Sequence, residues 1–169
     1  MRKTLKHIIT AGVIAIATTA TAHADDFKPE AIDFDQSLPS MRTVLSAVCS
    51  STTERNIDPI EIPGTRRAQT QIDCTGLSFG GKLRLAEFVF RDDELALVWV
   101  LTDKVEEQAI EARMTKLFGT PSHKAGSATA FTHAHTALRK DIAEVLFYAP
   151  SVAPMFEAWF DQMVDAKNE

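Results

Sequence analysis

The sequence of 169 residues contains only two cysteines, and their spacing does not form the Cys-x-x-Cys pattern of redox enzymes. It also lacks a Gly-x-Ser-x-Gly nucleophile motif, a glycine-rich phosphate loop and a calcium loop with alternating acidic ligands. These absences argue against a thiol oxidoreductase, a serine hydrolase of the common type, a nucleotide-binding enzyme and an EF-hand protein. No motif identifies a reaction, and we do not expect an enzyme.

Long apolar runs are also scarce, and the one that is present lies near the N-terminus. It covers residues 8–20, precedes the small-residue triplet Ala-His-Ala at 22–24, and follows three basic residues, Arg2, Lys3 and Lys6. A membrane anchor needs about 20 apolar residues, so a secretory signal peptide over residues 1–24 is the better interpretation. We therefore predict a periplasmic or secreted protein with a single exported domain over residues 25–169.

Positive charge is limited as well. Without the leader, 15 Lys and Arg remain against 23 Asp and Glu, which gives a formal charge of −8. Binding to nucleic acids and to anionic lipids depends largely on Lys and Arg, so we expect no nucleic-acid partner and no stable membrane insertion after removal of the leader. The one basic cluster is interpreted as a solvated surface; it comprises Arg66, Arg67, Lys82 and Arg84.

The two cysteines, Cys49 and Cys74, predict a single structural disulfide. An even pair in a small exported domain usually forms a bridge, because the compartment is oxidising. A bridge that closes a loop of about 25 residues stabilises the fold by roughly 3 kcal/mol. A redox-active pair is the alternative interpretation.

The hydrophobic pattern predicts an α+β fold, with an antiparallel sheet of about five strands and helices packed mainly on one face. The expected helices are residues 38–48, 104–118 and 154–164, and the expected strands are residues 69–79, 82–90, 95–101, 128–135 and 142–148. Residues 50–68 have few periodic apolar positions and predict a long loop. Such loops often carry functional surfaces.

The order of the first helix, the three-strand meander and the cysteine pair resembles the helix-plus-antiparallel-sheet domains of two families. These are the β-lactamase inhibitor proteins and the small outer-membrane assembly lipoproteins. The resemblance concerns order and size, and Asp25 stands where a lipoprotein would have its cysteine. It therefore implies no particular function and no residue role.

The histidines are the candidate metal ligands. His133 and His135 are two residues apart in the predicted strand over 128–135, so their imidazoles are expected on one face. A third ligand from His123 or Asp141 would complete a zinc or copper site. The alternative is that these histidines are ordinary surface residues, and no other cofactor is indicated.

The last predicted helix carries an aromatic stripe at helical spacing, formed by Phe156, Trp159 and Phe160. The stripe either packs on the sheet or leaves one edge exposed as a binding surface. In the second case Trp159 is the natural hot spot.

Two functions from different classes remain open. The first is an exported binding or accessory module that recognises an envelope protein or a small ligand through its loop and sheet face. The second is a small metal-binding protein or enzyme that uses His133 and His135.

Overall fold

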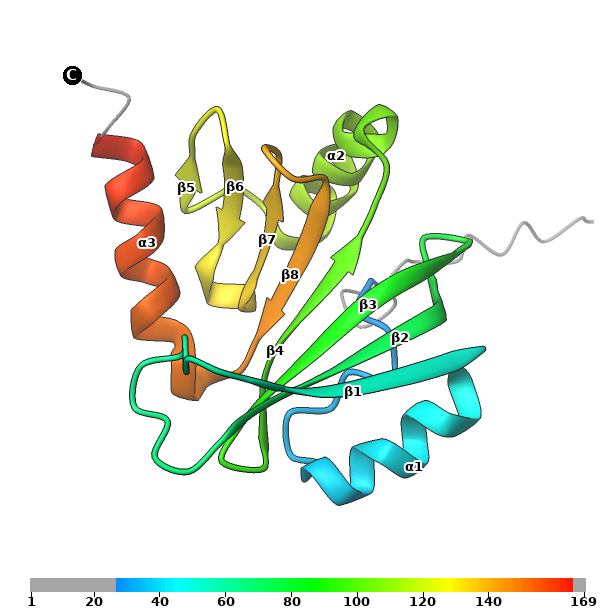
Figure 1. Cartoon of the computed structure of the whole chain (residues 1–169). Coiled ribbons are helices and arrows are strands. Elements are labelled where there is room, and N and C mark those ends of the chain that lie inside the picture. The colour runs from blue at the N-terminus through cyan, green and yellow to red at the C-terminus, as the bar shows by residue number, and fades with distance from the viewer. Residues whose placement is uncertain (1–26, 166–169) are drawn as a thin grey trace, which may run out of the picture.

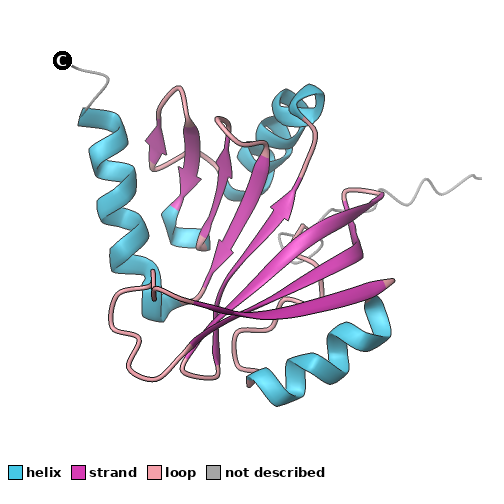
Figure 2. Ribbon diagram, viewed as in Figure 1, coloured by secondary structure: helices cyan, strands magenta, loops and turns pink. Residues whose placement is uncertain are grey.

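The computed structural model describes residues 27–165, and the predicted signal peptide lies outside these residues (Figure 1). The described chain is α+β, with three α-helices and one eight-stranded antiparallel sheet (Figure 2). The strand order is β1-β2-β3-β4-β8-β7-β6-β5. No helix in this part of the chain is long and apolar enough to cross a membrane.

The helices and strands have the following bounds. The α-helices are α1 (Leu38–Val48), α2 (Glu107–Phe118) and α3 (Ala153–Asp165), and short 3-10 helices are η2 (Lys104–Glu106), η3 (Thr132–Ala134) and η4 (Pro150–Val152). The strands are β1 (Ser51–Ile57), β2 (Gln69–Phe79), β3 (Lys82–Arg91), β4 (Glu94–Leu101), β5 (His123–Lys124), β6 (Ala128–Phe131), β7 (Thr136–Arg139) and β8 (Glu144–Tyr148).

The α+β class and the antiparallel sheet confirm the prediction. The predicted number of about five strands was too low, since the sheet has eight. The predicted loop over residues 50–68 was wrong in its first part, because residues 51–57 form the edge strand β1. Six of the seven β1 side chains are exposed, so the strand has no apolar alternation that a sequence pattern could reveal. The other additional strands are short, and β5 has only two residues.

The chain contains two consecutive units of similar design. In each unit one helix is followed by four strands in a meander: α1 precedes β1–β4, and α2 precedes β5–β8. The two meanders join through the antiparallel pair β4 and β8. The helix α3 follows the second unit and has no counterpart after the first.

The helices are distributed over both faces of the sheet. One hydrophobic cluster contains Met41 and Leu45 of α1, Met114 of α2, and inward residues of the sheet such as Phe88. The second cluster, on the opposite face, contains Phe156 and Phe160 of α3 together with sheet residues, namely Val89, Leu97, Ala137, Leu146 and Tyr148. Thus α1 and α2 cover one face, and α3 covers part of the other.

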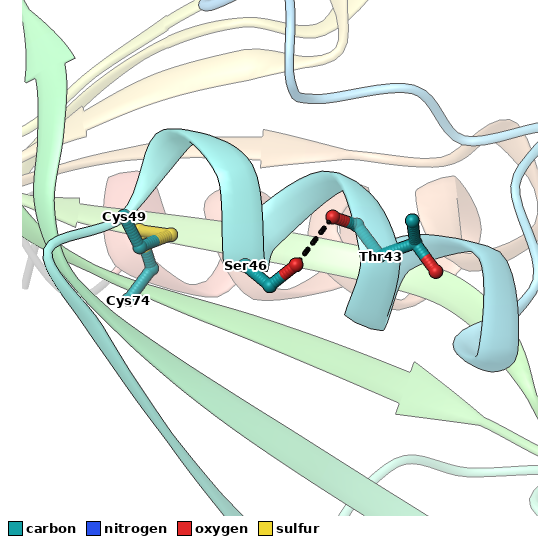
Figure 3. Close-up of a disulfide and its surroundings, with 4 residues drawn as sticks. All are labelled: Thr43, Ser46, Cys49 and Cys74. Atoms are coloured by element: carbon teal, nitrogen blue, oxygen red, sulfur yellow. Dashed lines mark hydrogen bonds between the residues drawn. A yellow bond between two sulfur atoms is a disulfide. The ribbon is translucent and has the colours of Figure 1, made fainter.

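The predicted disulfide is present and joins Cys49, directly after α1, to Cys74 of β2. Figure 3 shows the bridge at the C-terminal end of α1. Since β1 begins two residues after Cys49, the bridge also fixes the entry of the chain into the edge strand.

The ends of the helices follow from their sequences. The hydroxyl of Ser37 caps the start of α1. Asp103 and Glu106 form a capping box around η2, immediately before α2. Gly119 ends α2 with a φ of 79°, a conformation that glycine adopts without strain.

Glu111 of α2 forms ion pairs with two lysines of the second unit. We expect that, without this carboxylate, the free energy of unfolding falls less when the pH is lowered. The Glu111 carboxylate lies 2.7 Å from the amino groups of both Lys124 and Lys140. Burial opposes ionisation, but these two lysines outweigh it and lower the pKa of Glu111 from 4.5 to about 2. The ionised carboxylate therefore stabilises the fold above about pH 4.5, and this contribution is lost as the pH falls towards about 2. We expect Glu111→Gln to be less stable at neutral pH and to lose less stability over that interval, as measured by urea unfolding at several pH values.

Candidate functional site

The candidate site is the part of the α3-side face that α3 does not cover. Side chains of β3 alternate between the two faces, and Leu83, Leu85 and Glu87 share a face with Val89, which packs in the α3-side cluster. In Figure 1, α3 runs beside the β5–β8 half of the sheet. Leu83 and Leu85 belong to the other half and remain 73% and 36% exposed.

The strand register places further side chains beside these leucines. Across the sheet, Glu87 pairs with Asp73 of β2 on one side and with Trp99 of β4 on the other. Leu101 lies two residues beyond Trp99 on the same strand and is partly exposed. We call this surface the open face and define it by Asp73, Leu83, Leu85, Glu87, Trp99 and Leu101.

An arginine held by aromatic rings marks the border between the open face and α3. The guanidinium carbon of Arg139 lies 5.7 Å from the ring centre of Trp99 and 5.8 Å from that of Trp159. Trp99 in turn makes an edge-to-face contact with Phe156, at 6.3 Å between ring centres. These contacts fix the orientation of Trp99.

Arg139 also neutralises two carboxylates at this border. Its Nε donates to Asp141 at 2.8 Å, and its Nη1 donates to Glu144 at 2.9 Å. The side chain of Glu144 is only 8% exposed, and this burial raises its pKa although Arg139 opposes the shift. A buried carboxylate of this kind is stable only with a paired cation.

On the opposite side of the open face, Asp73 is paired in the same way. Arg55 of β1 forms an ion pair with the Asp73 carboxylate. The amide of Gln71 donates a further hydrogen bond to it at 2.7 Å. Asp73 is therefore satisfied within the described chain.

Glu87 differs from these two carboxylates. No Lys or Arg in residues 27–165 forms an ion pair with it, and its side chain is partly buried. Burial and the neighbouring Asp73 raise the pKa of Glu87, while Arg55 and the Gln71 amide only partly oppose the shift. The centre of the open face thus carries a carboxylate in an unfavourable environment.

The substitution Glu87→Gln is therefore expected to increase the free energy of unfolding at neutral pH. A carboxyl group whose pKa is raised by folding destabilises the fold once the pH exceeds its unfolded value, and has no such effect when both states are protonated. The gain should be present at about pH 7 and disappear at about pH 3.5, below the ordinary pKa of Glu. Urea unfolding at the two pH values checks it, with the exposed Glu30→Gln as control. A loss of stability of Glu87→Gln at neutral pH would contradict the conclusion that the ionised Glu87 carboxylate destabilises the fold.

The structure places the aromatic stripe mainly in the core. Phe160 is 1% exposed and Phe156 is 5% exposed, so both belong to the cluster between α3 and the sheet. Trp159 is partly exposed and contacts Arg139 at the border of the open face. Of the three predicted binding residues, Trp159 is the one that a partner on the open face can reach.

The three histidines do not converge. The strand predicted over residues 128–135 ends at Phe131, and His133 lies in η3, so the premise that two imidazoles share a strand face was wrong. His133 donates from Nε2 to the carbonyl of Phe118, whereas His135 has a φ of 47° and packs on Tyr148. His123 pairs with Asp161 of α3 at 2.9 Å. In residues 27–165, no group of three His, Cys, Asp or Glu side chains is arranged to hold a metal ion.

The predicted basic cluster is divided into two pairs of residues, which lie at opposite ends of β3. Lys82 and Arg84 lie at its start and pair with Glu106, and Arg84 is only 7% exposed, so the expectation of a solvated position was wrong there. Arg66 and Arg67 lie near the other end, where their backbone amides donate to Asp92.

The part of the predicted loop that remains a loop covers residues 58–68. It packs on the sheet through Ile62, which is buried in the α3-side cluster.

One signal in the sequence indicated the open face. In β3 the apolar residues change from odd positions, Leu83 and Leu85, to even positions, Phe88 and Phe90. The structure explains the change, because the even positions face the α1–α2 side and the two leucines face the uncovered side.

Comparison with known family models, curated proteins and solved structures finds no match for this chain.

Proposed function

We propose that the protein is an exported binding module that recognises an envelope protein through the open face. The observation that carries the proposal is the exposure of Leu83 and Leu85 beside Trp99 and Leu101, on the part of the sheet face that α3 leaves uncovered. Clustered apolar side chains at a surface, with a polar border, are typical of sites of protein interaction.

The residue types and the rigidity of the open face support the proposal. Its side chains stand on three neighbouring strands, β2, β3 and β4, so a partner meets a preformed surface and little conformational entropy is lost on binding. Trp and Arg are enriched among residues that dominate binding energy, and Trp99, Trp159 and Arg139 lie together at one border.

The compartment is part of the proposal. The leader-like sequence over residues 1–24 supports export, and the disulfide between Cys49 and Cys74 is compatible with an oxidising environment. An envelope protein is therefore the class of partner that the molecule would meet.

The test compares two variants in which an aspartate replaces exposed apolar residues. Leu83→Asp with Leu85→Asp places charge on the open face, whereas Val48→Asp does so on α1, where Val48 is 46% exposed. We expect the tagged wild-type protein and the Val48→Asp variant to retain the same envelope partner after crosslinking, and the open-face variant to lose it. Equal retention by all three proteins, each with the same thermal unfolding midpoint, would contradict the proposal.

A further inference from the structure

Three carboxylates lie close together on the open side of the sheet, and two of them already have an arginine. Arg55 pairs with Asp73, and Arg139 pairs with Glu144. Glu87 lies between them: it is the register neighbour of Asp73, and its charge also acts on Glu144. It has no such arginine among the described residues.

Glu87 cannot be avoided by a partner that covers the apolar part of the open face. Leu85 and Val89 flank it along β3 on the same face, and Trp99 is its neighbour on β4. A surface that contacts both Leu85 and Trp99 therefore also removes water from the Glu87 carboxylate.

The free energy of that desolvation determines which partner can bind. Burial of an ionised carboxylate without a cation is strongly unfavourable, and this cost is comparable to the gain from covering two or three apolar side chains. A purely apolar partner would therefore gain little here. A partner that brings a positive charge converts the penalty into a charge-assisted hydrogen bond.

We propose that the partner segment presents an arginine side chain to Glu87, with its stem on Leu85 and its guanidinium against Trp99. This inference rests on the proposed function of the open face. Arginine fits better than lysine, because a planar guanidinium can stack on an indole and pair with a carboxylate at the same time. Arg139 already shows this arrangement within the chain, since it contacts Trp99 and donates to Glu144.

The experiment uses defined peptides rather than an unidentified partner. Random 12-residue peptides displayed on phage are selected on the purified protein, and peptides that also bind the Leu83→Asp/Leu85→Asp variant are removed. The remaining peptides depend on the open face. The tightest one is synthesised with arginine and with citrulline, which has the same shape without the charge, and both forms are titrated calorimetrically.

We expect arginine to be enriched in the face-dependent peptides, and citrulline to weaken binding by about ten-fold or more. Glu87→Gln should cause a similar loss, and citrulline should cause little further loss in that variant, because the two changes remove the same interaction. Glu30→Gln, on an exposed residue beside α1, should bind as the wild type does.

The outcomes separate this inference from the proposed function. Face-dependent peptides without basic residues, or equal affinity of the arginine and citrulline forms, would overturn the role of Glu87 and leave the open face as a binding surface. The absence of any face-dependent peptide would contradict both. A thermal unfolding midpoint at or above that of the wild type, for each variant, shows that the losses do not come from misfolding.

Discussion

Replacing Cys49 and Cys74 together with alanine is expected to lower the free energy of unfolding by about 3 kcal/mol. The bridge closes a sequence separation of 25 residues and is the one disulfide in the chain, which has no free cysteine. It restricts the unfolded chain and holds α1 against β2. The loss should be clear in equilibrium urea unfolding, because a difference of this size shifts the midpoint strongly.

The edge strand β1 should be the most sensitive region in that variant. It buries none of its side chains completely, and its side-chain contacts include the ion pairs of Arg55 with Asp73 and of Glu54 with Arg42. The wild-type protein in reductant should unfold like the double variant, whereas Ser46→Ala on α1 should change stability by less than about 0.5 kcal/mol. Unfolding of the double variant at the wild-type urea concentration would contradict this account of the bridge.

Phe160→Ala is expected to cost about 3 to 4 kcal/mol, because it removes a fully buried aromatic side chain and leaves a cavity. The Phe160 ring packs on Phe156 at 6.2 Å and on Trp159 at 5.2 Å between ring centres. It belongs to the cluster that attaches α3 to the sheet. Equilibrium unfolding of the variant measures the loss directly.

The exposed Gln162→Ala on the same helix is the matched control and should be close to neutral. The pair distinguishes the two interpretations of the aromatic stripe. A large loss for Phe160→Ala shows that the stripe is core, whereas a small loss combined with weaker partner binding would show that it is an interface.

The long, strongly patterned elements could be predicted from the sequence. The helix ends followed from Ser37, Asp103 and Gly119, whose side chains or conformations act locally. The central strand β4 followed from its apolar run, since both of its faces are covered along most of its length. The disulfide followed from the count of two cysteines.

The elements that were missed lack a local signal. β1 is polar because it lies at the edge of the sheet, so only its hydrogen-bonded pairing with β2 identifies it as a strand. The same holds for His133 and His135, since the end of β6 at Phe131 depends on the turn through η3 and not on a breaker residue. Pairing in the folded chain, not propensity, decides such segments.

The open face could be anticipated only in outline. A sheet face was part of the functional hypothesis, and the change of apolar parity within β3 was visible. Which half of the face remains uncovered depends on where α3 packs, and that is a tertiary property. The unpaired state of Glu87 depends on the register of three strands and could not be read from the sequence.

The most direct test of the central claim is site-specific photocrosslinking in intact cells. A photoreactive phenylalanine analogue replaces Leu83 on the open face or Val48 on α1, two exposed apolar positions on different sides of the sheet. The account predicts one discrete protein adduct from position 83 and none from position 48. An adduct from position 48 alone, or no adduct from either position in cells that express the protein, would contradict the open face as the binding surface.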